Sequence, residues 1–117
     1  MRYSVIRYIV ILTMARKPQA GPASDPEVLI LSSLANGPKH GYAILTDVET
    51  FAGCTLGAGT LYTAITRLVE KGWIAPEPVE GRQRPYHLTG QGAECLKARL
   101  EEMQKVARIG LKRLQTA

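Results

Sequence analysis

Apolar residues gather in three short stretches before residue 72. The first stretch, residues 28–34, could be a strand by periodicity alone. It follows Asp25-Pro26, a pair that suits the start of a helix, and precedes Asn36-Gly37, which suits an end, so we interpret it as a short, mostly buried helix. The second covers residues 40–49, and the third runs from about residue 59 to residue 71. The pattern therefore predicts three short helices. We expect these residues of the second and third helices to face inward: Ile44, Leu45, Val48, Leu61, Ile65, Leu68 and Val69.

The pattern then changes from helical to extended. Trp73-Ile74 opens an extended segment, which two following prolines confine to the edge of a sheet. A turn at residues 80–84 and a returning strand at residues 85–88 complete a two-stranded hairpin. Leu56, in the glycine-rich connection before the third helix, is a candidate for a further short edge strand. Three helices followed by a β-ribbon are the elements of a winged helix-turn-helix, so the predicted fold is mostly α with a small β-wing.

A long helix is predicted from residue 89 to the C-terminus. Its apolar residues alternate at spacings of four and three, which is the heptad pattern of a coiled coil. One helix cannot bury this seam and the flanking Val106, Ile109 and Leu111 within so small a domain, so we expect a partner helix from a second copy of the chain. The candidate dimerisation residues are Leu96, Leu100, Met103, Ala107 and Leu114.

Residues 1–23 are predicted to form a leader outside the domain. Their apolar run, residues 5–12, is too short to span a bilayer, which takes about 20 residues. Three interpretations stay open: a packed extra strand or helix, a signal peptide with a poor cleavage site, and a non-native extension before Met14 as the natural first residue. The boundaries that follow are 1–23 for the leader, 24–88 for the winged helix and 89–117 for the dimerisation helix.

Charge is unevenly distributed over the 117 residues, which carry 15 Lys and Arg against 10 Asp and Glu. Residues 1–22 carry a net charge of +4, residues 23–81 a net charge of −4, and residues 82–117 a net charge of +5. A basic end beside a mildly acidic core is typical of a protein that binds a polyanion, and composition alone does not distinguish nucleic acid from a membrane surface. Anchoring to a membrane surface through residues 1–17 is a weaker alternative, and we expect no membrane partner.

The residues that usually catalyse reactions or bind metal are few and dispersed. Cys54 and Cys95 have no second cysteine or histidine at metal-ligand spacing, which argues against a zinc site or a disulfide scaffold. His40 and His87 have no nearby acid–nucleophile grouping, and the chain has no phosphate-binding loop of the Walker type. We therefore expect no enzyme, no metal and no cofactor.

The third helix carries the features of a DNA-reading surface. No charged side chain occurs from Thr55 to Thr66, so a phosphate backbone can approach the positive end of this helix without acidic repulsion. Hydroxyl and threonine methyl groups can contact phosphates, base edges and thymine methyl groups. Arg67 adds charge further along, and Arg82 and Arg84 at the hairpin tip can reach the flanking backbone or a minor groove.

Three motifs resemble the PadR family of bacterial transcriptional regulators. They are HGY at 40–42, GTLY at 59–62 with a following RL at 67–68, and YHLT at 86–89. Together they span most of residues 26–96, in the order and at the separations of the family. The resemblance implies a winged-helix DNA-binding regulator of the repressor type, whose C-terminal helix mediates dimerisation.

The resemblance also implies which residues face DNA. Gly57-Ala58 and Thr63 depart from the Ser-Pro pair and the proline that are usual in the family, and glycine is an acceptable helix cap. Two simpler interpretations stay open: Tyr62 packs under the wing, and His40 serves only the turn. The candidate DNA-binding residues are Lys39, His40, Tyr42, Thr60, Tyr62, Thr63, Thr66, Arg67, Arg82 and Arg84.

These observations predict a cytoplasmic, homodimeric regulator that represses transcription by binding a pseudo-palindromic operator in double-stranded DNA. The alternative is a winged helix that binds another protein and no DNA. A small-molecule effector, if one exists, would act by changing the spacing of the two recognition helices through the C-terminal helix pair.

Overall fold

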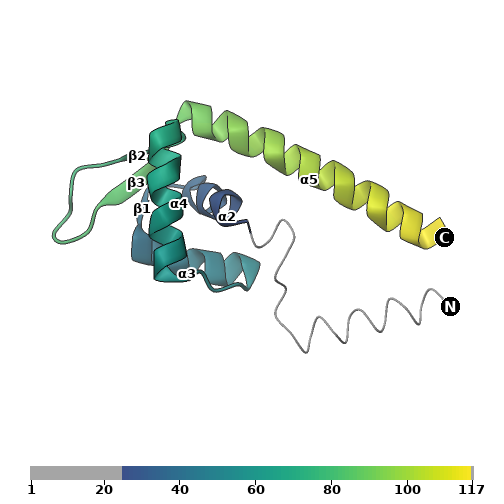
Figure 1. Cartoon of the computed structure of the whole chain (residues 1–117), viewed down its shortest axis with the longest axis horizontal. Coiled ribbons are helices and arrows are strands. Elements are labelled where there is room, and N and C mark those ends of the chain that lie inside the picture. The colour runs from purple at the N-terminus through teal and green to yellow at the C-terminus, as the bar shows by residue number, and fades with distance from the viewer. Residues whose placement is uncertain (1–24, 117) are drawn as a thin grey trace.

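The described part of the chain consists of four helices and three short strands. The computed structural model describes residues 25–116, and the predictions made for the leader, residues 1–23, lie outside the described residues. The elements are α2 (Pro26–Leu34), β1 (Lys39–His40), α3 (Gly41–Ala52), α4 (Ala58–Lys71), β2 (Ile74–Pro76), β3 (Pro85–Leu88) and α5 (Gly90–Thr116) (Figure 1). Three short helices, a β-ribbon and a long final helix confirm the predicted winged helix-turn-helix.

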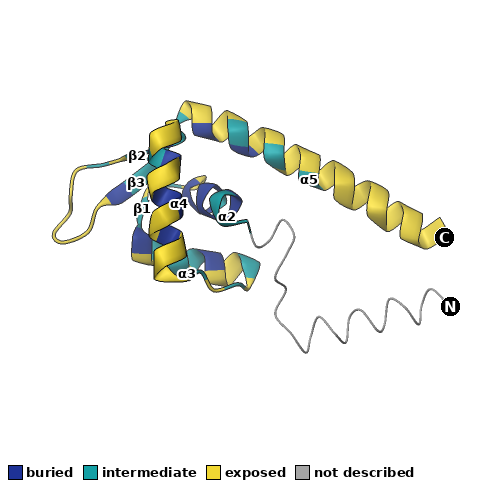
Figure 2. Ribbon diagram, viewed as in Figure 1, coloured by how far each residue is buried: buried dark blue, intermediate teal, exposed yellow. Residues whose placement is uncertain are grey.

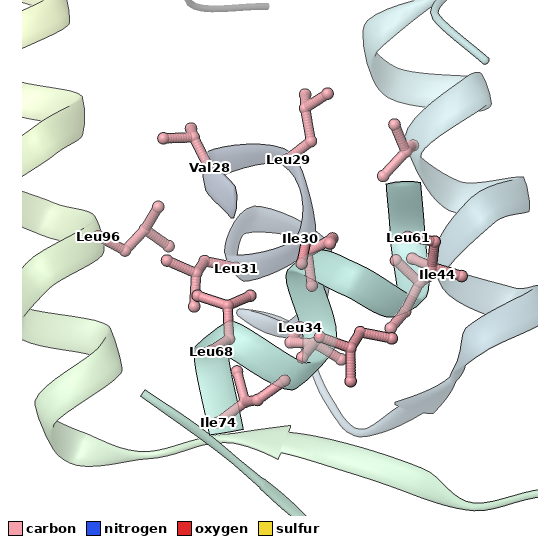
Figure 3. Close-up of a cluster of buried hydrophobic side chains, with 13 residues drawn as sticks. Val28, Leu29, Ile30, Leu31, Leu34, Ile44, Leu61, Leu68, Ile74 and Leu96 are labelled. Atoms are coloured by element: carbon pink, nitrogen blue, oxygen red, sulfur yellow. The ribbon is translucent and has the colours of Figure 1, made fainter. Parts of the chain in front are cut away.

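Helix α2 forms the centre of the fold. Asp25 caps its N-terminus, because Oδ1 accepts hydrogen bonds from the backbone N–H groups of Glu27 at 3.0 Å and Val28 at 3.4 Å. The apolar residues of α2 lie buried among those of α3, α4 and α5 (Figure 3). Ser33 is buried with them, and its hydroxyl donates to Asp47 Oδ2 at 2.7 Å, which satisfies this buried polar group.

The predicted inward faces of α3 and α4 contribute to the same core. Both helices end at a glycine with left-handed backbone angles, Gly53 at φ 65° and Gly72 at φ 77°, a conformation that costs little without a Cβ atom. The buried residues among those predicted are Ile44, Val48, Leu61, Ile65 and Leu68, and the partly buried ones are Leu45 and Val69.

The wing is a three-stranded antiparallel sheet in the order β1-β3-β2, so the prediction of a two-stranded hairpin was incomplete. Lys39 and His40 add a strand to the open edge of β3, opposite Tyr86 and Pro85 respectively. Leu56 forms no strand and packs against the core instead. Hydrophobic periodicity does not reveal a two-residue strand, because such a strand depends on the edge that it pairs with.

Helix α5 is attached to the domain by its first two turns. The backbone N–H of Thr89 donates to the carbonyl oxygen of Trp73 at 3.0 Å, and the Thr89 hydroxyl accepts from the N–H of Gly92 at 3.0 Å. A Cβ atom at position 92 would lie 1.9 Å from that same Trp73 oxygen, so the close approach requires glycine. Beyond Leu96, most of α5 is exposed as it runs away from the domain (Figure 2).

No helix between residues 25 and 116 combines the length and the apolar character needed to cross a bilayer.

Candidate nucleic-acid interface

The exposed side of α4 is polar, and its first nine residues carry no charge. The buried residues of α4 all lie on one side of the helix, which leaves the opposite side open to solvent. Residues 58–66 include no charged side chain, no asparagine and no glutamine. All five DNA-binding residues predicted on this helix are exposed, and together they form what we call the reading face: Thr60, Tyr62, Thr63, Thr66 and Arg67.

The N-terminus of α4 has no side-chain cap. Gly57 occupies the N-cap position with extended backbone angles, and the first turn contains no acidic residue. The N–H groups of this turn therefore lack a side-chain acceptor, and such groups at the positive end of a helix attract anions. The Gly57-Ala58 pair thus starts α4 without the Ser-Pro pair that is usual in the family it resembles. The backbone N–H groups at the N-terminus of α4 remain accessible to an anion.

A hollow of about 270 Å³ lies between the wing, the start of α3 and α4. We call it the wing hollow. It brings together side chains from three separate segments of the sequence, including two guanidinium groups and no carboxylate. Its lining residues are His40, Gly41, Tyr42, Tyr62, Arg82, Gln83, Arg84 and Tyr86. Five of these were predicted to bind DNA, so the structure gathers half of the predicted set in one place.

Tyr62 extends across the wing hollow toward the start of α3. Its side chain is 53% exposed, yet a Cβ atom at Gly41 would lie only 2.7 Å from its hydroxyl oxygen. Glycine at position 41 therefore makes room for the tyrosine ring. The ring packs against α3 while about half of its surface stays in contact with solvent, so packing and ligand contact are compatible at this residue.

His40 and Tyr42 flank this glycine and differ in their contacts. His40 is the N-cap of α3, and its Nδ1 accepts a hydrogen bond from the backbone N–H of Ala43 at 3.3 Å. The proton of the neutral ring then lies on Nε2, which is the nitrogen that can donate to a ligand. Tyr42 is 71% exposed at the second position of α3.

Lys39 is engaged within the protein. Its ammonium group donates to the carbonyl oxygen of Ser33 and to Asn36 Oδ1, and it lies 4.0 Å from Asp47 Oδ2. Only 18% of its side chain is exposed. Lys39 thus stabilises the C-terminal end of α2, and the structure does not bring its charge together with the arginines of the wing hollow.

The two arginines near the wing tip have different contacts. Glu80 and Gln83 exchange backbone hydrogen bonds of 2.7 and 2.9 Å, which close the tip into a tight turn. Arg84 Nη1 donates to the carbonyl oxygen of Glu77 at 3.1 Å and so braces the wing. The exposed side chain of Arg82 forms no hydrogen bond or ion pair within residues 25–116, so its charge is available to a ligand.

The other flank of α4 lies beside acidic groups. Thr60, Thr63 and Arg67 line a second depression together with Asp25 and Glu27. Arg67 is exposed and forms no ion pair among the described residues. The positive charge of Arg67 is therefore unpaired but lies near two carboxylates, unlike the charges of the wing hollow.

A cluster at the base of the wing was missed by the sequence analysis. Lys71 Nζ lies 3.0 Å from Glu27 Oε1 and 4.5 Å from the centre of the Trp73 ring. Arg99 Nη1 lies 3.4 Å from the same carboxylate oxygen, and its guanidinium carbon is 5.4 Å from the same ring. These four residues, which we call the base cluster, connect α2, α4 and α5. They lie up to 72 positions apart, so no local motif reveals them.

The predicted dimerisation residues fall into two groups. Leu96 is buried in the core of its own protomer, and Met103 is partly buried against that core. Leu100, Ala107 and Leu114 are exposed, so they are the ones that a partner can reach. Further exposed apolar side chains on α5 are Val106, Ile109 and Leu111.

Most of this chain is similar in sequence to known proteins. Residues 30–98 match the transcriptional regulator PadR-like family. An uncharacterized 37.1 kDa protein in transposon TN4556 of Streptomyces fradiae is 42% identical over 84 residues. These residues are 72% of this chain and 24% of that protein, so the chain spans about a quarter of the length of the curated relative that it matches.

Solved structures share the fold. A transcriptional regulator from Clostridium thermocellum is 29% identical, with a TM-score of 0.66 over 74% of this chain and 89% of that chain. A PadR family transcription regulator from Clostridium difficile is 24% identical, with a TM-score of 0.69 over 76% and 97% of the two chains. F93 from STIV, a winged-helix DNA-binding protein, is 17% identical, with a TM-score of 0.63 over 68% and 87%.

The family match covers more than half of the chain, and it includes the three motifs, the reading face and the wing hollow. The solved structures show the same winged-helix arrangement. The chain therefore belongs to the PadR-like family, whose members are transcriptional regulators and not enzymes.

Proposed function

We propose that this protein represses transcription as a homodimer that binds a pseudo-palindromic operator in double-stranded DNA. Each protomer places the reading face of α4 in a major groove, and Arg82 and Arg84 lie over the neighbouring backbone or a minor groove. The observation that carries the proposal is the position of the reading face, which bears no acidic residue, beside the wing hollow, which has two arginines and no carboxylate.

Three kinds of donor on this surface support contact with phosphates. The N–H groups of the first turn of α4 supply partial positive charge, and exposed hydroxyl groups on α3 and α4 supply neutral donors. Arg67 and Arg82 supply full charges that no carboxylate among the described residues neutralises. Phosphate contacts fix the register of a protein on DNA, so the reading face then meets base edges.

A second copy of the chain is the partner that fits α5. At about 1.5 Å per residue, this helix of 27 residues is ~40 Å long, and its apolar side chains beyond Leu96, except the partly buried Met103, lie in solvent. Depressions border the seam on both sides, one including Leu100 and Met103, the other including Met103 and Val106. A two-fold axis packs the same surface of each copy against the other, and a heptad seam is suited to such pairing.

The symmetry of a dimer determines the form of the operator. Two reading faces related by a two-fold axis require inverted half-sites whose centres lie about one or two helical turns apart, with ~10 bp per turn. A dimer at such a site excludes other proteins from the same DNA. Repression by exclusion requires only a DNA-binding surface and a dimer interface. Repression in the cytoplasm, beside the DNA, is therefore the mode of action that we propose.

Selection of bound fragments from random-sequence DNA tests the proposal. We expect an enriched inverted repeat with the spacing of one or two turns. Titration of the selected duplex should then show a steep dependence on salt, with a loss of about three to five decades in affinity between about 50 and 200 mM for six to ten phosphate contacts. The absence of an enriched sequence would contradict the proposal and favour a winged helix that binds another protein.

A further inference from the structure

The side chain of Thr66 is oriented by a hydrogen bond within its own helix. Its hydroxyl donates to the carbonyl oxygen of Tyr62, one turn earlier, at 2.9 Å. The side chains of Thr60 and Thr63 form no hydrogen bond among residues 25–116. The exposed threonines of the reading face therefore present different chemical groups to a ligand.

The hydrogen bond leaves Thr66 with an unengaged methyl group and with an oxygen that can accept but not donate. Oγ1 and Cγ2 are both attached to Cβ and occupy different staggered positions. Because Oγ1 is turned toward the Tyr62 carbonyl, the methyl group must point in a different direction. The single proton of the hydroxyl is already donated. Because Thr66 is exposed, it offers an apolar contact to whatever meets the reading face.

Apart from Arg67, the reading face lacks the side chains that most often read bases by paired hydrogen bonds. Arginine on guanine and asparagine or glutamine on adenine are the common pairs, and none of these residues occurs from Ala58 to Thr66. Arg67 lies on the flank that borders Asp25 and Glu27. Within the major groove, an apolar side chain recognises a base chiefly through the 5-methyl group of thymine.

We propose that Thr66 is a specificity-determining residue whose methyl group contacts the 5-methyl group of one thymine in each operator half-site. This inference deepens the proposed function and depends on it. Cytosine at the same position has no 5-methyl group, so this methyl contact favours thymine over cytosine.

The test uses the full chain and a duplex that it selects from random-sequence DNA. Each thymine of the half-site is replaced in turn by deoxyuridine, which removes only the 5-methyl group. For the unchanged protein, one position per half-site should lose about fourfold in affinity, which corresponds to one buried methyl group. Thr66→Val retains the methyl group, so this variant should still lose affinity when that thymine is replaced by deoxyuridine. Thr66→Ser lacks the methyl group, so it should bind the thymine and the deoxyuridine duplexes equally.

Thr50→Ser is the matched control. The Thr50 hydroxyl donates to the carbonyl oxygen of Thr46 at 3.0 Å, so the same methyl group is removed from the same local geometry on α3, and the thymine preference should persist. The inference is overturned if no thymine responds to deoxyuridine, or if Thr66→Ser retains the response, while the proposed function stands. A protein that selects no duplex at all would overturn the proposed function and this inference together.

Discussion

Lys71 Nζ lies 3.0 Å from both carboxylate oxygens of Glu27, which joins the last turn of α4 to the first turn of α2. The same carboxylate meets Arg99 of α5, and both cations lie over the ring of Trp73. The base cluster thus joins α4 and α5 to α2 at the base of the wing. Substitution of Glu27, whose carboxylate both cations share, measures how much the cluster contributes to stability.

Glu27→Ala is expected to lower the free energy of unfolding by about 1 kcal/mol, because one carboxylate serves two cations and only 16% of its side chain is exposed. The loss should decrease as salt screens the charges. Urea unfolding at a fixed protein concentration, at low and at high salt, measures both effects. Glu49→Ala is the control, since Glu49 is exposed and forms no ion pair among the described residues. Equal losses for the two variants would contradict this role of the base cluster.

Gly92→Ala is expected to destabilise the protein by about 1–3 kcal/mol, the usual cost of overpacking a closely packed site. The added Cβ atom would lie 1.9 Å from the Trp73 carbonyl oxygen, a backbone atom that cannot rotate away. Thermal or urea unfolding measures the effect. Gly90→Ala makes the same change two residues earlier, where no atom lies within 4 Å of the added group, and should leave stability nearly unchanged.

Gly41→Ala is expected to change DNA binding more than stability. The added methyl group meets the end of the Tyr62 side chain, which is half-exposed and can move, so the fold should persist while the tyrosine leaves its place in the wing hollow. We expect a weaker affinity for the selected duplex and an unfolding transition close to that of the unchanged protein. In a Tyr62→Ala variant, adding Gly41→Ala should have little further effect on the affinity for DNA. A full additional loss there would show that Gly41 acts independently of Tyr62.

Substitution of Arg82 and Arg84 together by alanine is expected to weaken binding to every DNA sequence. Because a dimer loses four guanidinium groups, the slope of log affinity against log salt concentration should become shallower by about four. Arg82→Ala alone removes two charges per dimer and should reduce this slope by about two without disturbing the wing, since Arg84 provides the brace to Glu77. Fluorescence anisotropy over a range of salt concentrations measures the slope. Arg108→Ala with Lys112→Ala removes the same charge from α5 and should leave the slope unchanged. An unchanged slope in the wing variant would exclude the wing as a phosphate contact.

Leu100→Glu combined with Leu114→Glu is expected to convert the proposed dimer to a monomer that keeps its fold. Both side chains are exposed in the protomer, at 39% and 50%, so the charges disturb the seam and not the core. Light scattering after size-exclusion chromatography measures the mass, and circular dichroism checks the helix content. Ala98→Glu, on the side of α5 away from the seam, should remain dimeric. A dimeric double variant would place the interface elsewhere.

The helices could be predicted because their causes are local. Asp25-Pro26 caps α2, Gly53 and Gly72 end α3 and α4, and the apolar spacing of each helix identifies the side that is buried. The candidate site could also be predicted in outline, since the reading face consists of neighbouring residues on one helix. The motif at residues 40–42 and the wing arginines meet it in the wing hollow, as the fold class implies.

The remaining features depend on partners that are distant in the sequence. Lys39 was predicted beside phosphates, but its ammonium group is held by Ser33 and Asn36, whose oxygens a pattern does not reveal. Leu96 fits the heptad seam by spacing, but it is buried in the core of its own protomer. The reason is that the first turns of α5 pack against the domain, and the helix projects from it only further along. Such assignments require the packed structure.

Met103 is the last residue of α5 that packs partly against the core, so residues 104–116 project from the domain. At about 1.5 Å per residue this projecting part is about 20 Å long, and a tilt of about one tenth of a radian displaces its far end by about 2 Å. In the proposed dimer, a shift of that size between the two far ends would therefore turn each winged domain by only a few degrees. Sequence changes near the C-terminus would then adjust the relative orientation of the two domains in small steps.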